Sequence, residues 1–152
     1  MADLRPILLV EDNPKDIELT LAALAKCQLA NSIVVVRDGA EALDYLYRRG
    51  EHTARNVGDP AVVLLDLKLP KVDGLEVLET VKRDPAHRQI PIVMLTSSRE
   101  ESDLVRSYEL GVNAFVVKPV DFNAFFEAIQ DLGMFWAVLN EPPPRASGLG
   151  KG

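Results

Sequence analysis

The sequence predicts an α/β protein built on one parallel sheet with helices on both faces, and three observations support this fold class. A chain of 152 residues with 47% hydrophobic and 26% charged residues has the size and composition of a single globular domain. A segment with helical spacing follows each of five short apolar runs, and this alternation calls for a parallel sheet with right-handed crossovers. The runs lack the in/out alternation of a strand with one wet face, so each predicts a strand covered on both sides. They are ILLV (7–10), IVVV (33–36), VVLL (62–65), IVML (92–95) and AFVV (114–117).

The helical segments are predicted from residues that recur on one helix face. Asn13 is the expected N-cap of the first, with Pro14 as its first residue. The second ends near Gly50, the third before Pro85 and the fourth just before Gly111. The positions that mark these four helices are, in order, Ile17, Leu21, Leu24 and Gln28; Ala40, Leu43, Tyr45 and Leu46; Leu75, Leu78 and Val81; and Leu104, Val105 and Tyr108.

The fifth helix is expected to be the longest, from about Phe122 to Leu139, with Asp121 as its cap. Strand order 2-1-3-4-5 then gives a flavodoxin-like (βα)5 doubly wound sheet with an extended C-terminal helix. RRGEHTARNVGDP (48–60) predicts a polar loop, and the Pro- and Gly-rich EPPPRASGLGKG (141–152) predicts a mobile tail. We expect one domain, residues 1–140, followed by that tail.

Composition excludes several classes of function. The net charge of −6 argues against binding to nucleic acid or to an anionic membrane. No apolar run approaches the ~20 residues of a membrane span, and the N-terminus lacks the pattern of a signal peptide, so a cytoplasmic protein is expected. Cys27 is the single cysteine and cannot form an internal disulfide; it lies in a helical pattern and is expected to be packed or half-exposed rather than to have a redox role.

Polar side chains follow the predicted strands at their carboxyl ends, where doubly wound sheets bind ligands. Glu11 and Asp12 follow the first strand, and Asp66 ends the third. Thr96 follows the fourth strand and Lys118 the fifth. Because the first and third strands flank the point where strand order reverses, we expect these residues to share one rim.

This set of residues indicates phosphoryl transfer to a carboxylate. Three close carboxylates raise one another's pKa unless a cation joins them, and oxygen ligands with open water positions suit Mg²⁺. The Lys118 ammonium and the Thr96 hydroxyl would then surround an oxygen-rich anion beside Asp66. A strand end would hold that nucleophile rigidly.

Each element of the set also has a simpler interpretation. Acidic residues before a helix stabilise its N-terminus, and a strand-terminal Asp commonly forms a turn. Thr96, Ser97 and Ser98 could cap the fourth helix, and Lys118-Pro119 could form a turn. Their joint occurrence, each at the correct strand end, favours the functional interpretation.

VEDN, LLDLKLPKVDG, MLTSS and FVVKP, in that order, resemble the receiver domain of two-component response regulators over residues 5–139. The resemblance implies that Asp66 accepts a phosphoryl group from a sensor histidine kinase. It also implies Mg²⁺ bound by Asp12, Asp66 and the backbone carbonyl of Lys68, with Glu11 acting through water. Lys118 and Thr96 would bind the phosphoryl group, Thr96 and Phe115 would act as switch residues, and the Lys118–Pro119 bond would be cis.

A narrower resemblance rests on EDNPKDIELTLAAL, the loop at 48–60, YELGVNAFVVKPVDF and LGMFWAVLN. These stretches are similar to the single-domain, CheY-like regulators paired with phytochrome-type kinases, which implies a bacteriophytochrome as the partner kinase. Lys68 departs from the Asn common at its position. Lys68 and Ser98 would flank the path of attacking water and tune slow autodephosphorylation; alternatively, Lys68 points into solvent.

Output is expected through a surface, because no further domain is evident. The fifth helix carries more apolar residues than one buried stripe, such as 122, 125, 129, 132 and 136, requires. We therefore expect a homodimer through residues of about 100–139. In the alternative, residues 135–139 fold back onto their own domain.

Three rival functions are weaker. A haloacid-dehalogenase-type Mg²⁺ phosphatase also uses a strand-end aspartyl nucleophile, but Lys68 stands where its general acid is needed, and we expect no turnover enzyme. A flavodoxin-type electron carrier would need a phosphate loop after the first strand, where EDNP would repel a flavin phosphate. A receiver-like module that only binds partners is disfavoured because each expected acidic, hydroxyl and lysine position is filled.

Overall fold

The computed structural model describes residues 5–27, 29, 31–55, 58–106, 108–112 and 114–132. These residues contain a five-stranded sheet in the order β2-β1-β3-β4-β5, and every neighbouring pair is parallel. The predicted fold class and strand order are confirmed. Each strand begins at the predicted residue, and β3 and β4 end one residue later than predicted. The strands are β1 (Ile7–Val10), β2 (Ile33–Val36), β3 (Val62–Asp66), β4 (Ile92–Thr96) and β5 (Ala114–Val117).

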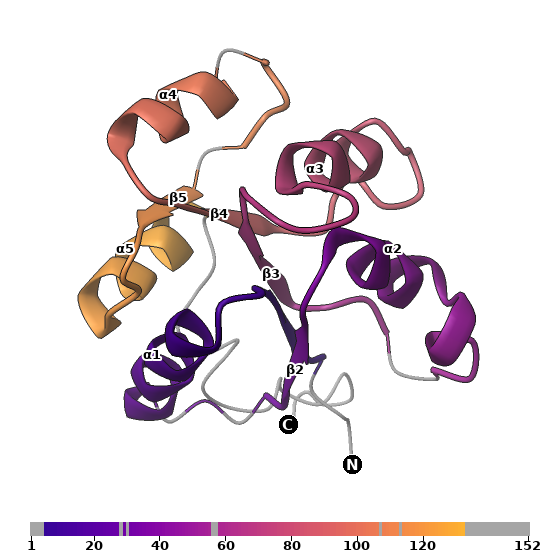
Figure 1. The fold of residues 1–152 in the computed structure, drawn as a ribbon, viewed down its shortest axis with the longest axis horizontal. Helices are drawn as coiled ribbons and strands as arrows, with labels where there is room; N and C mark the ends of the chain where they lie inside the picture. The colour runs from indigo at the N-terminus through magenta and orange to yellow at the C-terminus, as the bar shows by residue number, and fades with distance from the viewer. Residues whose placement is uncertain are drawn as a thin grey trace, which may run out of the picture.

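Helices cover both faces of the sheet (Figure 1). Successive residues of the inner strands alternate between the two faces: Val62 and Leu64 of β3 pack with one set of helices, Val63 and Leu65 with the other. Both faces are therefore apolar, which is why the strands read as continuous apolar runs. One face is covered by α1 (Pro14–Lys26) and α5 (Phe122–Asp131), and the other by α2 (Gly39–Tyr47), α3 (Gly74–Lys82) and α4 (Arg99–Arg106).

Strand register brings the predicted site residues to one edge. Val10 of β1 lies beside Leu65 of β3, so the next residues along these strands, Glu11 and Asp66, are neighbours. Beyond β3, Thr96 closes β4, and the backbone N–H of Lys118 donates to the Thr96 carbonyl at 2.8 Å. The sheet alone thus aligns the ends of β1, β3, β4 and β5.

Two helix ends differ from the prediction because the backbone turns earlier. Arg48 takes a left-handed φ of 56° and ends α2 at Tyr47, before Gly50. The fourth helix ends at Arg106, so Tyr108 and Gly111 lie beyond it. Leu104 and Tyr108 have exposed fractions of 52% and 44% and do not belong to the core. Only Val105, of the three residues that marked this helix, is buried.

The first and fifth helices begin as predicted. The Asn13 side chain accepts the backbone N–H groups of Lys15 and Asp16, and Asp121 caps α5 in the same way. Phe125 and Ile129 face the core, but Phe122 has an exposed fraction of 38%, so the proposed covering stripe was wrong at that position. The predicted continuation to Leu139 and the tail at 141–152 lie outside the described residues.

The stretch at 48–60 contains more structure than the predicted polar loop. It includes the 3-10 helix η1 (Gly50–His52). The Arg55 guanidinium lies 4.4 Å over the Tyr45 ring and donates to the Tyr45 carbonyl and to the Gly58 carbonyl, at 3.0 Å and 2.8 Å. The segment is therefore held to α2 by its own Arg55 cation, which contacts the Tyr45 ring of that helix. Apolar periodicity does not reveal such a contact.

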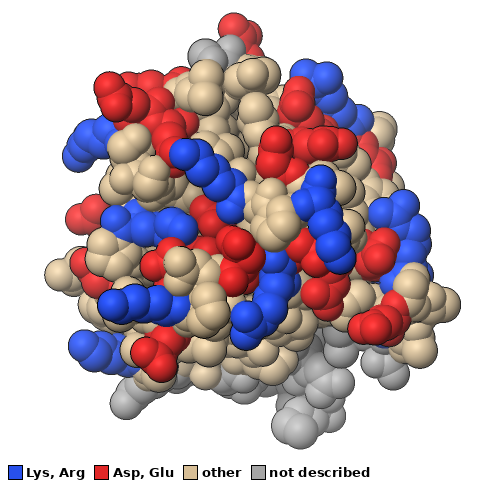
Figure 2. All heavy atoms as spheres, in the orientation of Figure 1, with Lys and Arg blue, Asp and Glu red and all other residues tan. Residues whose placement is uncertain are grey.

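The surface mixes charges of both signs. Figure 2 shows basic side chains beside acidic ones over much of the visible face, with acidic side chains also gathered near its centre. Among the described helices, none has the length and hydropathy needed to cross a bilayer. Cys27 is buried and its thiol donates to the Ala23 carbonyl at 3.4 Å, as expected for a packed cysteine.

Candidate functional site

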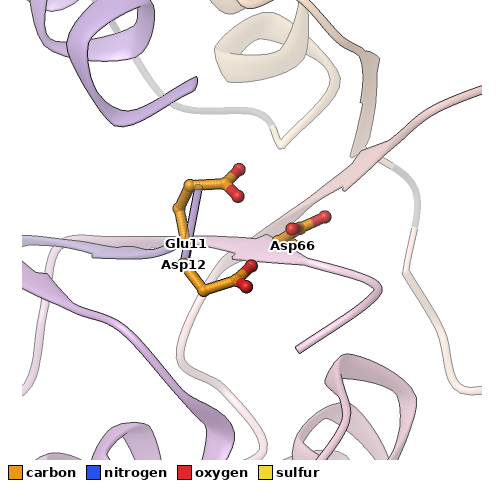
Figure 3. Close-up of side chains that lie close together, drawn as sticks. All are labelled: Glu11, Asp12 and Asp66. Carbon is orange, nitrogen blue, oxygen red and sulfur yellow. The ribbon is translucent and has the colours of Figure 1, made fainter. Parts of the chain in front are cut away.

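Three carboxyl groups meet at the carboxyl edge of the sheet. Glu11 and Asp12 come from the loop after β1, and Asp66 is the last residue of β3. One oxygen of each lies within 4.8 Å of those of the other two, and Figure 3 shows the side chains around a common space. Glu11 and Asp66 are 0% and 5% exposed, whereas Asp12 is exposed. The group therefore opens to solvent on the Asp12 side.

Burial makes ionisation of this group costly. Burial, with the neighbouring charge of Asp66, raises the pKa of Glu11 to about 7. Burial also raises the pKa of Asp66 above its ordinary value, although Lys118 beside it acts in the opposite sense. A cation among the three oxygens would stabilise the ionised forms, and hard oxygen donors with an open side suit a divalent ion such as Mg²⁺. The donor set fits a divalent metal.

The ammonium of Lys118 lies against carboxylates from three different elements. Its Nζ is 3.2 Å from Glu11 Oε1, 3.4 Å from Asp66 Oδ2 and 3.0 Å from Asp16 Oδ2. Burial by itself lowers the pKa of Lys118, but the hydrogen bond to Asp16 and the charges of Asp66 and Glu11 raise it above its ordinary value. The amine is therefore a fixed cation beside Asp66. The Lys118–Pro119 bond is cis, as the resemblance implies.

Asp16 is a member of this constellation that the sequence interpretation missed. It lies in the first turn of α1, where an acidic residue is common simply because it stabilises the helix N-terminus. The available signal was the cap at Asn13, which fixes where the helix starts. Even so, spacing alone does not show that this carboxylate reaches a lysine more than 100 residues further along the chain.

The Thr96 hydroxyl is held by the fourth helix. Thr96 is fully buried, and its Oγ1 lies 3.0 Å from Oγ of Ser102, which is also buried. Ser102 in turn lies 3.4 Å from the Ser98 carbonyl. The predicted switch hydroxyl is thus at the rim but hydrogen-bonded to α4, a partner that the sequence did not identify.

The start of α4 is tied to the loop after β3. Ser98 Oγ accepts the Glu101 backbone N–H at 3.2 Å, so the simpler interpretation of Ser98 as a cap is confirmed. Glu101 accepts the Ser97 backbone N–H at 2.8 Å and pairs with Lys68 Nζ at 3.1 Å. Lys68 therefore bridges to α4 even though its side chain is 80% exposed. The exposure agrees with the alternative of a Lys that points into solvent, and a role of Lys68 in tuning dephosphorylation stays a prediction.

The predicted aromatic switch position is half-buried beside α4. The guanidinium of Arg106 lies 4.1 Å from the centre of the Phe115 ring. Both residues line a hollow between α4, β5 and α5 that Ser102 also lines. Phe115 and Thr96 therefore contact the same helix, although their role as switch residues stays a prediction.

Comparison with known proteins identifies the family to which this site belongs. The family model of the response regulator receiver domain matches residues 7–130. The chain belongs to this family. The receiver fold accounts for the five-stranded sheet, and the family is one of phosphorelay regulators rather than of turnover enzymes, which leaves the phosphatase alternative without support.

The relatives of this receiver include phytochrome response regulators. Response regulator Rcp1 of Synechocystis is 39% identical over 130 residues, covering 86% of this chain and 87% of that protein. The bacteriophytochrome response regulator AtBRR is 76% identical, with a TM-score of 0.88 over 92% of this chain and all of that one. The phosphorylated cyanobacterial phytochrome response regulator RcpA is 41% identical, with a TM-score of 0.70 over 88% and 94%.

A divalent metal is known in one relative. Rcp1 has been solved in an Mn²⁺-bound form, with a TM-score of 0.69 to this receiver over 87% of this chain and 94% of that one. Together with the carboxylate group at Glu11, Asp12 and Asp66, this places the receiver among proteins suited to a divalent cation. The individual ligands, including the Lys68 carbonyl and the water-mediated role of Glu11, stay predictions.

Proposed function

We propose that this receiver accepts a phosphoryl group on Asp66 from the phosphohistidine of a sensor kinase, with Mg²⁺ bound by Asp12, Asp66 and the Lys68 carbonyl and with Glu11 acting through water. One observation carries the proposal: a buried strand-end carboxylate lies beside two other carboxyl groups and has a lysine ammonium 3.4 Å away. The ammonium, and a divalent cation if the carboxyl groups hold one, would supply positive charge that stabilises an incoming phosphoryl group.

In the transfer, an Oδ of Asp66 forms a bond to phosphorus while the phosphorus–nitrogen bond of the phosphohistidine breaks. The bonding pair returns to the imidazole nitrogen, which takes up a proton, and Asp66 becomes an acyl phosphate. Lys118 and Thr96 would bind phosphoryl oxygens. Mg²⁺, when bound, supplies charge that neutralises those oxygens and the crowded carboxylates.

The partner in this proposal is a phytochrome-type histidine kinase. The similarity to Rcp1, RcpA and AtBRR supports that pairing, since two of these proteins are described as phytochrome or bacteriophytochrome response regulators. We further propose that the protein acts in the cytoplasm as a single-domain regulator. Its folded unit would be residues 1–140, with residues 141–152 as a tail.

The direct test is to incubate the protein with Mg²⁺ and acetyl phosphate and to follow intact mass. Wild type is expected to gain one phosphoryl group, and Asp66→Asn none. Asp38→Asn is the matched control, because Asp38 also follows a strand but caps α2 and does not belong to the group of Glu11, Asp12 and Asp66. Absence of an adduct in wild type, or an adduct in Asp66→Asn, contradicts the proposal, and rapid multiple turnover of the donor would indicate a phosphatase.

A second test addresses the kinase. Phosphotransfer from a bacteriophytochrome kinase is expected to be faster than from a histidine kinase without a phytochrome sensor, measured with radiolabelled phosphohistidine under single-turnover conditions. Equal rates from both kinases would contradict the phytochrome pairing while leaving the phosphoacceptor role intact.

Output through a homodimer formed by residues of about 100–139 is the second part of the proposal. Large apolar side chains are exposed on and after α4, on β5 and at the start of α5, namely Leu104, Tyr108, Val117 and Phe122. Burial of such residues favours association. Sedimentation is expected to show a dimer at high micromolar concentration. A monomer, whether or not Asp66 is phosphorylated, would contradict this part.

A further inference from the structure

Lys118 has more carboxylate partners than the binding of a phosphoryl oxygen beside Asp66 requires. An ammonium carries three N–H donors, and Nζ of Lys118 is within 3.4 Å of an oxygen of Glu11, Asp66 and Asp16. Two of these partners, Glu11 and Asp66, also belong to the group of possible metal ligands. A divalent cation bound there, to Asp66 directly and to Glu11 through water, would compete with the ammonium for both.

Asp16 differs from the other two partners in two respects. It comes from α1 rather than from a strand end, and it stands outside that group of three. It also makes the shortest of the three contacts, at 3.0 Å. When a cation occupies the carboxylate group, Asp16 is therefore the carboxylate of the three that remains committed to the ammonium.

The backbone of Asp16 is held in place. Its N–H donates to Asn13 Oδ1 at 3.2 Å, in the same cap that receives Lys15 N–H at 2.9 Å, and Pro14 starts the helix. Asp12 lies just before this cap. The cap thus sets the spacing between a candidate metal ligand and the carboxylate that contacts Lys118.

We propose that Asp16 is a positioning residue for phosphoryl transfer: its carboxylate holds the Lys118 ammonium beside Asp66 when a divalent cation occupies the Glu11, Asp12 and Asp66 carboxylates. The inference rests on the proposed phosphoacceptor function. A lysine side chain is long and flexible, so an anchor that leaves its other donors available reduces the reorganisation needed when a phosphoryl oxygen arrives.

A purely structural role for Asp16 makes a different prediction. If its carboxylate only stabilised the N-terminus of α1, its removal would lower stability but would act independently of Lys118. If it positions the ammonium, its effect on phosphorylation disappears once Lys118 has been removed, because contacting residues in one network are not additive.

The experiment measures the initial rate of Asp66 phosphorylation by acetyl phosphate at saturating Mg²⁺, by intact mass, in the full chain. The variants are Asp16→Asn, Asp16→Glu, Lys118→Ala and the Asp16→Asn/Lys118→Ala double variant. Glu18→Gln is the matched control, since it removes the same charge from an exposed position of the same helix. Mg²⁺ affinity and thermal unfolding are measured for each variant.

We expect Asp16→Asn to lower the rate about tenfold, the effect of one charge-assisted hydrogen bond, with Mg²⁺ affinity within about twofold of Glu18→Gln. Asp16→Glu is expected to restore part of the rate, and Asp16→Asn to have no further effect in the Lys118→Ala background. A rate for Asp16→Asn equal to that of Glu18→Gln, or multiplicative effects in the double variant, would overturn the inference. Failure of wild type itself to form an adduct would instead overturn the proposed function on which it rests.

Discussion

Glu11 carries a carboxyl group that is shielded from water and faces another carboxyl group at a strand end. In water, a glutamate would be ionised throughout the neutral range, but burial and Asp66 raise the pKa of Glu11 to about 7. In the absence of a divalent cation the residue therefore titrates near neutral pH. Ionising the buried Glu11 carboxyl thus destabilises the folded protein, and a bound cation would remove this destabilisation.

This cost predicts a pH dependence of stability. Between about pH 4.5 and 7 the folded protein holds a proton on Glu11 that the unfolded chain releases, so the free energy of unfolding falls as pH rises. The loss due to Glu11 levels off once the pH has risen past about 7, where the folded protein also releases this proton. Urea denaturation of metal-free protein should show it, and added Mg²⁺ should stabilise more at pH 8 than at pH 5.5.

Glu11→Gln provides the control, since the amide has nearly the same shape and no charge. The variant is expected to lose most of the pH slope between 4.5 and 7 and to gain less stability from Mg²⁺. An unchanged slope would mean that Glu11 is not the titrating group.

The Lys68–Glu101 pair predicts a change in phosphoryl lifetime. We expect Lys68→Ala to speed loss of the phosphoryl group about two- to fivefold, because the pair links the loop after β3 to the start of α4 beside Ser98 and an exposed ion pair is worth up to about 1 kcal/mol. Decay of the adduct by intact mass is the measurement. Lys71→Ala, from the same loop, is the control, and equal decay in both variants would remove Lys68 from this role.

At the scale of elements, the loop from β3 to α3 packs so closely against the first residues of α2 and α3 that both of these residues must be glycine. A Cβ on Gly74 would lie 2.1 Å from the Asp66 carbonyl oxygen and 2.6 Å from that of Leu67. A Cβ on Gly39, at the start of α2, would similarly approach the Val72 carbonyl. Backbone atoms cannot yield as a flexible side chain does, so Gly74 is what permits the close approach of α3 to the backbone of Asp66 and Leu67.

Gly74→Ala is therefore expected to destabilise the protein by about 3 kcal/mol or more and to weaken Mg²⁺ binding, since the loop that carries Lys68 must move. Gly58→Ala is the matched control, because among the described residues its Cβ would meet only Arg5 side-chain atoms, at 3.8 Å and 3.9 Å. That variant is expected to stay within about 0.5 kcal/mol of wild type. Similar denaturation midpoints for the two variants would contradict the packing argument.

Elements differ in how far sequence predicts them. The strands could be located to within a residue because each is an uninterrupted apolar run, and the caps at Asn13 and Asp121 because one side chain determines the local backbone. The end of α2 could not be located from the sequence, since it depends on the left-handed conformation of Arg48. The rim of Glu11, Asp12, Asp66, Thr96 and Lys118 followed from topology. The sequence did not predict the contacts of Asp16, Ser102 and Glu101. Each of these side chains contacts a residue of another element, and no local sequence pattern encodes such a contact.

At the scale of the whole molecule, the sheet separates two apolar cores. Ile129 of α5 belongs to the core on the α1 and α5 face, and Ile92 of β4 to the core on the opposite face. Both side chains are buried, and the layer of strands lies between the two clusters. A substitution in one core should therefore not alter the packing of the other core, except where the strands transmit the change.

Ile129→Val and Ile92→Val test this separation. Each is expected to cost about 1 kcal/mol of unfolding free energy, and the double variant the sum to within about 0.5 kcal/mol. Urea denaturation of the three variants is the measurement. A coupling energy well above that limit would show that the two cores respond as one.

The hydrogen bond between Thr96 and Ser102 has a consequence for any protein that binds α4. If the phosphorylated state draws the Thr96 hydroxyl away from Ser102, phosphorylation at Asp66 and binding of a target to α4 are thermodynamically linked. A target that prefers α4 without that bond must then favour phosphorylated Asp66 by the same factor by which phosphorylation favours the target. Because of this reciprocity, the downstream partner not only binds the phosphorylated receiver but also acts as its effector. The fraction of receiver that is phosphorylated would then depend on the concentration of the target.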